Sequence, residues 1–257
     1  MDTDVLAVAL GAVVAGAGGL LVPRLIGAIP EIEPEAASAP EPETETDSDP
    51  EAAPVATPDP EEPPEPFAQI AALPGLAWRS SLVAAVAGAL LGAGLGWHWE
   101  WLMWVPLVPA YVALALVDWR TRLLPTFVIW RLYAVLVALV LIGWAVTQDT
   151  GAVVHAALGW LVYGGLFVVL WFIYPRGLGY GDVRLSGVLG IALGWLGWGP
   201  LVVGLYAAVL LGGVLGVVLT VLKIIDRRNN PFGPYMLVGA LIGVVWGDQI
   251  WSSLYGG

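Results

Sequence analysis

The sequence of 257 residues contains no cysteine, only two histidines and few charges, since charged residues make up 12% of it. The absence of cysteine excludes disulfides, cysteine-ligated zinc, iron–sulfur clusters and thiol nucleophiles. The ten Lys and Arg residues form no dense basic patch, which argues against a nucleic-acid-binding protein. Hydrophobic residues, by contrast, make up 58% of the chain, with 33 Gly and 14 Trp, and the mean hydropathy is +0.81. This composition is typical of a membrane protein.

Eight apolar segments approach the length of roughly 20 residues that a membrane span requires. We therefore predict an all-α polytopic membrane protein with about eight transmembrane helices and a lipid bilayer as its surroundings. The acidic flank before the first segment is unlike a secretory signal peptide, which predicts a retained helix with its N-terminus outside. The predicted spans are residues 5–22, 81–97, 101–117, 126–147, 152–174, 184–199, 201–222 and 234–254.

Basic residues support this topology. Eight spans that start outside place every Lys and Arg on or near one side of the membrane, which the positive-inside rule identifies as the cytoplasm. The ten residues are Arg24, Arg79, Arg120, Arg122, Arg131, Arg176, Arg184, Lys223, Arg227 and Arg228.

Residues 30–66 differ in composition from the rest of the chain. They hold 13 of the 21 acidic residues, 11 prolines and no Lys or Arg. Such a segment cannot bury a core, so we predict a disordered acidic cytoplasmic loop between residues 1–29 and a core of seven helices in residues 67–257. The loop is either a solvated tether or an electrostatic attractant for a basic partner.

Two further patterns concern helix packing and the membrane interface. Glycines four residues apart, such as Gly88 and Gly92, predict close contacts between helices. Tryptophan groups predict interfacial anchors at two outer turns. These groups are Trp97, Trp99, Trp101 and Trp104, followed by Trp195 and Trp198.

Two carboxylates stand out at predicted span ends. Asp118 ends the third span and Asp182 precedes the sixth, and the two spans between them return both to the cytoplasmic side. A carboxylate at membrane depth is costly, which makes each a candidate functional residue. Gly179 and Gly181 flank Tyr180 before Asp182. Glycine permits positive φ and close approach, which would leave room for an extended peptide.

The stretches around these residues resemble the prepilin peptidases, the type IV leader peptidases of bacteria. Gly179–Leu185 resembles their Gly-x-Gly-Asp signature. Asp118–Pro125 resembles their first catalytic segment, an Asp followed by a basic stretch and Leu-Pro. Pro231–Pro234 resembles the motif before their last span, and residues 11–30 are similar to their N-terminal helix.

The resemblance implies an aspartic endopeptidase without a metal or cofactor, in which Asp118 and Asp182 are the catalytic pair. Gly179, Gly181, Arg184 and Pro125 would be structural residues of the motifs. Two positions depart from the family, because Arg184 replaces its usual Lys and Thr126 replaces an Asp that often follows Leu-Pro.

The resemblance also implies a substrate and a location. Prepilin peptidases cleave the basic leader of type IV prepilins or pseudopilins, whose apolar helix lies in the membrane. We therefore expect a multi-pass protein of the bacterial cytoplasmic membrane with its active site facing the cytoplasm. Bifunctional members carry a Cys-rich, zinc-binding module in the first cytoplasmic loop, linked to N-methylation. This chain has no cysteine, so we expect no N-methyltransferase activity.

Three alternatives remain open at this point. A proton-coupled transporter or channel also uses intramembrane acids, here Asp118 and Asp182, as a relay. A noncatalytic assembly protein would retain the helix bundle alone. Another Gly-x-Gly-Asp intramembrane protease would share the aspartates and act on a different substrate.

Overall fold

The computed structural model describes residues 3–31, 65–173, 175, 178–215, 218, 222 and 231–255. Within these residues all regular secondary structure is helical, which agrees with the predicted all-α class. The first part comprises α1 (Thr3–Gly19), α2 (Val22–Gly27), α3 (Phe67–Ala71), α4 (Leu76–Leu95), α5 (Trp99–Trp104), the short 3₁₀ turn η2 (Val105–Leu107) and α6 (Val108–Thr121). The second part comprises α7 (Thr126–Thr147), α8 (Thr150–Gly159), α9 (Gly165–Ile173), α10 (Tyr180–Leu196), α11 (Trp198–Leu210) and α13 (Gly233–Tyr255), with π-helical turns η3 (Trp160–Gly164) and η4 (Leu211–Leu215).

Five of the described helical segments are long and apolar enough to cross a membrane. They are Leu76–Leu95, Trp99–Thr121, Thr126–Thr147, Thr150–Ile173 and Gly233–Tyr255. Two shorter apolar helices, Asp4–Gly19 and Trp198–Val214, coincide with the first and seventh predicted spans. The total of eight spans and the outside N-terminus remain predictions.

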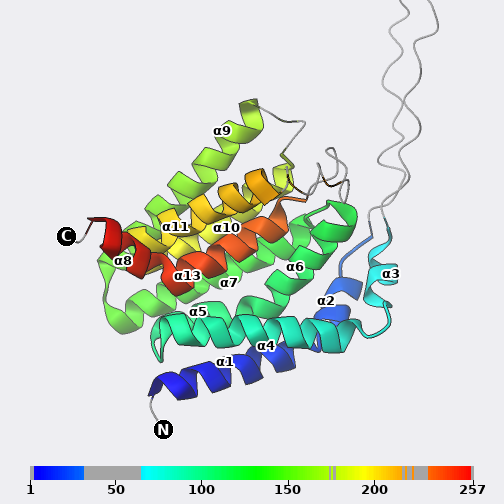
Figure 1. The fold of residues 1–257 in the computed structure, drawn as a ribbon, viewed down its shortest axis with the longest axis horizontal. Coiled ribbons are helices and arrows are strands. Elements are labelled where there is room, and N and C mark those ends of the chain that lie inside the picture. The colour runs from blue at the N-terminus through cyan, green and yellow to red at the C-terminus, as the bar shows by residue number, and fades with distance from the viewer. Residues whose placement is uncertain are drawn as a thin grey trace, which may run out of the picture.

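Helix α10, which covers most of the sixth predicted span, lies at the centre of the bundle. It contacts α7, α8, α9, α11 and α13. Its buried residues lie all around its circumference, as expected for a helix enclosed by other helices. In Figure 1, α1 and α4 lie side by side along one edge of the bundle, and α9 lies at the opposite edge.

One end of the bundle gathers several helix ends. Helices α2 and α3 pack together there, and α2 also contacts α6 (Figure 1). Helix α6 ends and α13 begins at the same place, and these two helices contact each other. A small apolar core, which includes Ile26, Phe67 and Ile70, joins α2 and α3 to Val117 of α6.

The predicted helix contacts through glycine are confirmed. A Cβ atom on Gly88 of α4 would collide with the carbonyl oxygen of Gly11 in α1, so the two backbones touch. The same holds between Gly190 of α10 and Gly159 of α8, and Gly239 of α13 would place a Cβ 2.5 Å from the amide nitrogen of Ala208 in α11. Small residues thus set the spacing of three helix pairs.

The predicted role of the tryptophans is wrong in part. Trp101, Trp104 and Trp195 are buried, whereas Trp97 is half exposed and Trp198 is partly exposed. The indole N–H of Trp101 donates to the carbonyl oxygen of Ala7 in α1 at 3.2 Å. Three of these indoles therefore fill the core, where the N–H groups of Trp101 and Trp195 find acceptors and that of Trp104 has none among the described residues.

The predicted disordered loop, residues 30–66, lies outside the described residues except for its two ends. At one end the Glu31 carboxylate accepts hydrogen bonds from the backbone N–H groups of Phe67 and Ala68, at 3.2 and 2.9 Å, and caps α3. At the other end Glu65 forms two hydrogen bonds of 2.8 Å with the guanidinium of Arg120. One end of the acidic segment is thus fixed to the start of α3, and the other to the last turn of α6.

Candidate active site

Asp118 lies in the last turn of α6, where the helix is terminated by Arg122 in the left-handed conformation with φ of 57°. The side chain is buried, with 3% of its surface exposed. Its Oδ2 atom accepts a hydrogen bond of 2.9 Å from the backbone N–H of Gly233 at the start of α13. Asp118 therefore holds the end of one helix to the beginning of another.

At position 233 any residue other than glycine would displace the Asp118 carboxylate from its present position. A Cβ atom there would lie 2.6 Å from Oδ2 of Asp118 and 3.2 Å from its Cγ, well inside normal contact distance. The absence of a side chain is what lets this amide reach the carboxylate.

Asp182 lies in the first turn of α10 and is also buried, with 7% of its surface exposed. Its Oδ2 atom accepts a hydrogen bond of 3.0 Å from the backbone N–H of Gly179. The Asp182 N–H in turn donates to the Gly179 carbonyl oxygen at 3.0 Å, which closes the helix start. The other carboxyl oxygen, Oδ1, is buried and has no hydrogen-bond partner among the described residues.

The two aspartates come together at one end of the bundle, as predicted. They are close enough to interact electrostatically. Gly181, next to Asp182, packs against the segment that follows Asp118, since a Cβ on Gly181 would lie 2.7 Å from Cβ of Leu124.

Of the two properties expected of Gly179 and Gly181, positive φ and close approach, the structure shows only close approach. Neither Gly179 nor Gly181 has a positive φ, and Gly179 is extended at φ −70° and ψ 145°. Close approach is what position 181 requires, because Leu124 fills the space in which a side chain would lie. The motif thus provides room for a neighbouring chain segment and needs no unusual backbone conformation.

Pro125 and Thr126 connect the two aspartate-bearing segments. The Pro125 carbonyl oxygen accepts hydrogen bonds from Val128 and Ile129 and so begins α7. Thr126, the first residue of α7, accepts a hydrogen bond at Oγ1 from the guanidinium of Arg184. The two positions that depart from the family therefore contact each other.

Arg184 is held in two further ways. Its guanidinium lies over the ring of Tyr180, 4.5 Å from the ring centre. Its carbonyl oxygen accepts a hydrogen bond of 3.1 Å from the hydroxyl group of Tyr133 in α7. Together with Thr126, these contacts fix the first turns of α10 against α7.

Sequence reasoning missed three of these contributions. It noted Pro231–Pro234 without a role, although Gly233 in this stretch contacts Asp118 directly. It also gave no role to Tyr133 or to the pair of Glu65 and Arg120. Arg120 holds the pKa of Glu65 below its ordinary value through the hydrogen-bonded ion pair. The Pro-Phe-Gly-Pro pattern was the one available signal.

A hollow of about 340 Å³ lies at the far end of α13, and neither Asp118 nor Asp182 lines it. Its lining includes Glu100, Asp149 and Asp248, which the sequence analysis did not group. The indole N–H of Trp195 donates to Glu100 at 3.4 Å.

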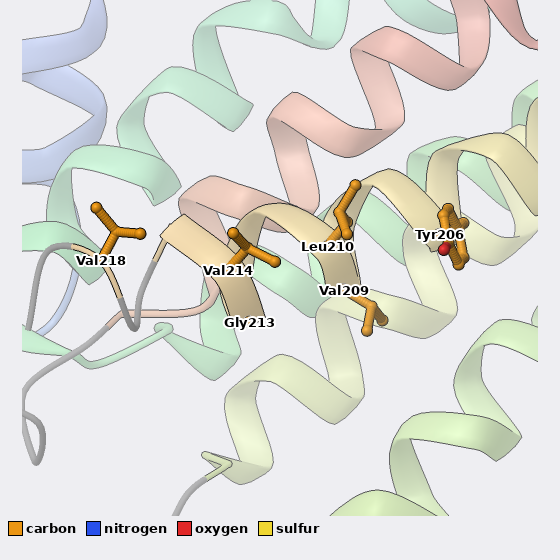
Figure 2. Close-up of a pocket in the computed structure, with 6 residues that line it drawn as sticks. All are labelled: Tyr206, Val209, Leu210, Gly213, Val214 and Val218. Carbon is orange, nitrogen blue, oxygen red and sulfur yellow. The ribbon is translucent and has the colours of Figure 1, made fainter.

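An open groove of about 470 Å³ runs along α11 and η4 (Figure 2). Among the residues that line it there is neither Asp118 nor Asp182 nor any other carboxylate. It is lined by Tyr206, Val209, Leu210, Gly213, Val214 and Val218.

Comparisons with known proteins agree with the resemblance. Residues 105–221 match the type IV leader peptidase family. A prepilin leader peptidase/N-methyltransferase of Pseudomonas putida is 34% identical over 180 residues, which are 64% of this chain and 58% of the relative. The protein of the same name from Stutzerimonas stutzeri is 31% identical over 183 residues, 68% of this chain and 61% of the relative.

The chain spans about three fifths of the length of these curated relatives. No solved structure matches it. The matched region contains both aspartates and ends before Gly233. The similarity to the type IV leader peptidase family is thus located in residues 105–221 of this chain.

Proposed function

We propose that the protein is a membrane aspartic endopeptidase that removes the basic leader from type IV prepilins or pseudopilins. The observation that carries the proposal is the meeting of two buried carboxyl groups, Asp118 and Asp182, from separate helices at one end of the bundle. We place this end at the cytoplasmic face of the bacterial inner membrane, where the leader of a membrane-held substrate would lie.

The chemistry follows from the proximity of the two acids. Two neighbouring carboxyl groups cannot both ionise cheaply and share one proton. The ionised group takes a proton from a water molecule, which attacks the scissile carbonyl carbon, and the protonated group donates to the carbonyl oxygen. Each Oδ2 atom already accepts a backbone N–H, so the unpartnered Oδ1 of Asp182 is available for the shared proton or the water.

The names of the relatives support the peptidase and do not favour the transporter alternative. Those names also include an N-methyltransferase. We propose that this chain lacks that second activity, because it has no cysteine from which to build the zinc-binding module that the resemblance implies.

The acidic segment suggests how the substrate is attracted. Its second end, Glu65, is bonded to Arg120 in the last turn of α6, which carries Asp118, and its first end, Glu31, caps the neighbouring α3. Thirteen acidic residues in 30–66 would raise the local concentration of a leader rich in Lys and Arg. A variant with residues 32–64 replaced by a Gly-Ser linker should cleave prepilin more slowly than the wild type at low salt and equally fast at high salt, because salt screens this attraction. Equal rates at all salt concentrations would refute the attraction and leave the peptidase proposal intact.

The catalytic proposal is tested by conservative substitution. Asp118→Asn and Asp182→Asn keep the side-chain volume and remove the titratable carboxyl group, so each should abolish prepilin processing in a co-expression assay. Asp248→Asn makes the same chemical change 15 residues beyond Gly233 on α13, about 22 Å along the helix, and should process normally. Full processing by either active-site variant would exclude that residue from the mechanism.

A further inference from the structure

The segment before α13 fits closely into the bundle through one side chain. The ring of Phe232 lies 5.6 Å from that of Phe167 in α9 and 6.3 Å from that of Tyr235, measured between ring centres. On another side it touches η4, where a Cβ on Gly212 would collide with the far edge of the Phe232 ring. Phe232 is thus enclosed by α9, η4 and α13.

Of the two π-helical turns among the described residues, one touches this ring and the other lies one aromatic residue away. Gly212 belongs to η4, and Tyr163 of η3 stacks against Phe167 at 5.4 Å, which in turn contacts Phe232. A π-helical turn widens a helix locally, and such turns occur often at functional sites. Here η4 contacts Phe232 directly, and η3 is linked to it through Phe167.

We propose that Phe232 is a positioning residue that sets where the Gly233 amide meets Asp118. The inference rests on the proposed catalytic role of Asp118. Gly233 directly follows Phe232, and its N–H lies 2.9 Å from Oδ2 of Asp118. Its Cα has no side chain because the carboxylate occupies that space. Two contacts therefore determine the position of the Gly233 amide: its hydrogen bond to the Asp118 carboxylate and the packing of the preceding Phe232 ring.

The contact matters because of the geometry that acid–base chemistry needs. A hydrogen bond from an amide to a carboxylate fixes the rotamer of the acid and stabilises its ionised form. A misplacement of about 1 Å costs roughly 100-fold in rate when reacting groups must be aligned. A shift of the Phe232 ring should therefore reach the chemistry through Gly233 while substrate binding stays intact.

Adjacent glycines of η4 provide a matched test. Gly212→Ala pushes a methyl group into the Phe232 ring, whereas Gly213→Ala points into open space, with no atom within 4 Å. We expect Gly212→Ala to lower kcat about 10- to 100-fold with KM for a purified prepilin unchanged, and Gly213→Ala to leave both unchanged. The double variant Gly212→Ala with Phe232→Leu should recover much of the lost kcat, because leucine lacks the ring atoms that collide.

A second pair of variants tests the same idea without adding atoms. Phe232→Leu alone removes part of the ring and should lower kcat several-fold at constant KM. Phe172→Leu, on the same α9 that holds Phe167 but with 81% of its surface exposed, serves as the control. All variants are compared at a temperature below their thermal unfolding midpoints.

Three outcomes would overturn the inference. The first is equal kcat for Phe232→Leu and Phe172→Leu, and the second is equal kcat for Gly212→Ala and Gly213→Ala. A change in KM alone would likewise place Phe232 outside the catalytic geometry. Failure of the proposed function looks different, since the wild type would then not cleave, or Asp118→Asn would cleave fully.

Discussion

Gly181→Ala is the substitution for which the structure gives the clearest expectation. The added Cβ would lie 2.7 Å from Cβ of Leu124 and 3.4 Å from its Cδ1. Two carbon atoms normally stay about 3.5–4.0 Å apart. The Cβ of Leu124 is attached to the backbone and cannot rotate away. The backbone at Gly181 or at Leu124 must therefore move by about 1 Å.

This shift acts directly on the proposed catalytic pair. Asp182 follows Gly181 in the first turn of α10, and the segment with Leu124 follows Asp118. A displacement of about 1 Å between reacting groups costs roughly 100-fold in rate. That factor corresponds to about 2.7 kcal/mol of lost transition-state stabilisation. We therefore expect kcat/KM for prepilin cleavage to fall about 100-fold.

The assay is cleavage of a purified prepilin in lipid or detergent, followed by the mobility shift of the product. Gly165→Ala is the matched control, because a Cβ at Gly165 meets nothing within 4 Å. It should retain wild-type kcat/KM and gain slightly in stability from the higher helix propensity of alanine. If folded Gly181→Ala cleaves at the wild-type rate, the close approach of Gly181 to Leu124 does not set the catalytic geometry.

Three further predictions concern the contacts around the site and the bundle. Thr126→Val should lower kcat several-fold because Arg184 loses its hydrogen-bond acceptor, whereas Thr126→Ser should cleave normally. Arg120 lowers the pKa of Glu65 from its ordinary value of 4.5, so their ion pair stabilises the fold above pH 4.5 and this stabilisation is lost as the pH falls through the lowered pKa. Glu65→Gln should therefore lower the free energy of unfolding by up to about 1 kcal/mol at pH 7 and leave it unchanged in strong acid, as measured by thermal unfolding. Gly88→Ala should lower the thermal midpoint, since overpacking between α1 and α4 costs about 1–3 kcal/mol.

The helices could be predicted from apolar runs, but their burial could not. Apolar composition identifies a segment that avoids water, and it does not distinguish lipid from protein as the surroundings. Helix α10 has Gly, Ser, Asp and Arg among its residues and is enclosed by other helices, so it differs from the more apolar helices that face outward. Trp101 was misassigned for a related reason, because an indole suits both an interface and a core that offers an acceptor, here the Ala7 carbonyl oxygen.

The aspartates could be predicted because carboxylates are rare in this chain outside residues 30–66. Asp118 and Asp182 were singled out by their place at span ends, and an even number of intervening spans predicted that both lie on the same side of the membrane. The partner of Asp118 could not be found in this way. Gly233 lies 115 residues away in the sequence, and a backbone N–H has no side-chain signature.

The two carboxyl groups differ in how their hydrogen bonds arise. Asp182 accepts from Gly179, three residues earlier, so this contact forms with the first turn of α10 itself. Asp118 accepts from Gly233 at the start of α13, so this contact exists only when α13 is docked against α6. One half of the site is therefore built by local sequence and the other by the assembled bundle. The geometry of Asp118 therefore depends on how the start of α13 packs in the bundle. For this reason Gly212 and Phe232, which lie far from Asp118 in the sequence, influence the proposed chemistry.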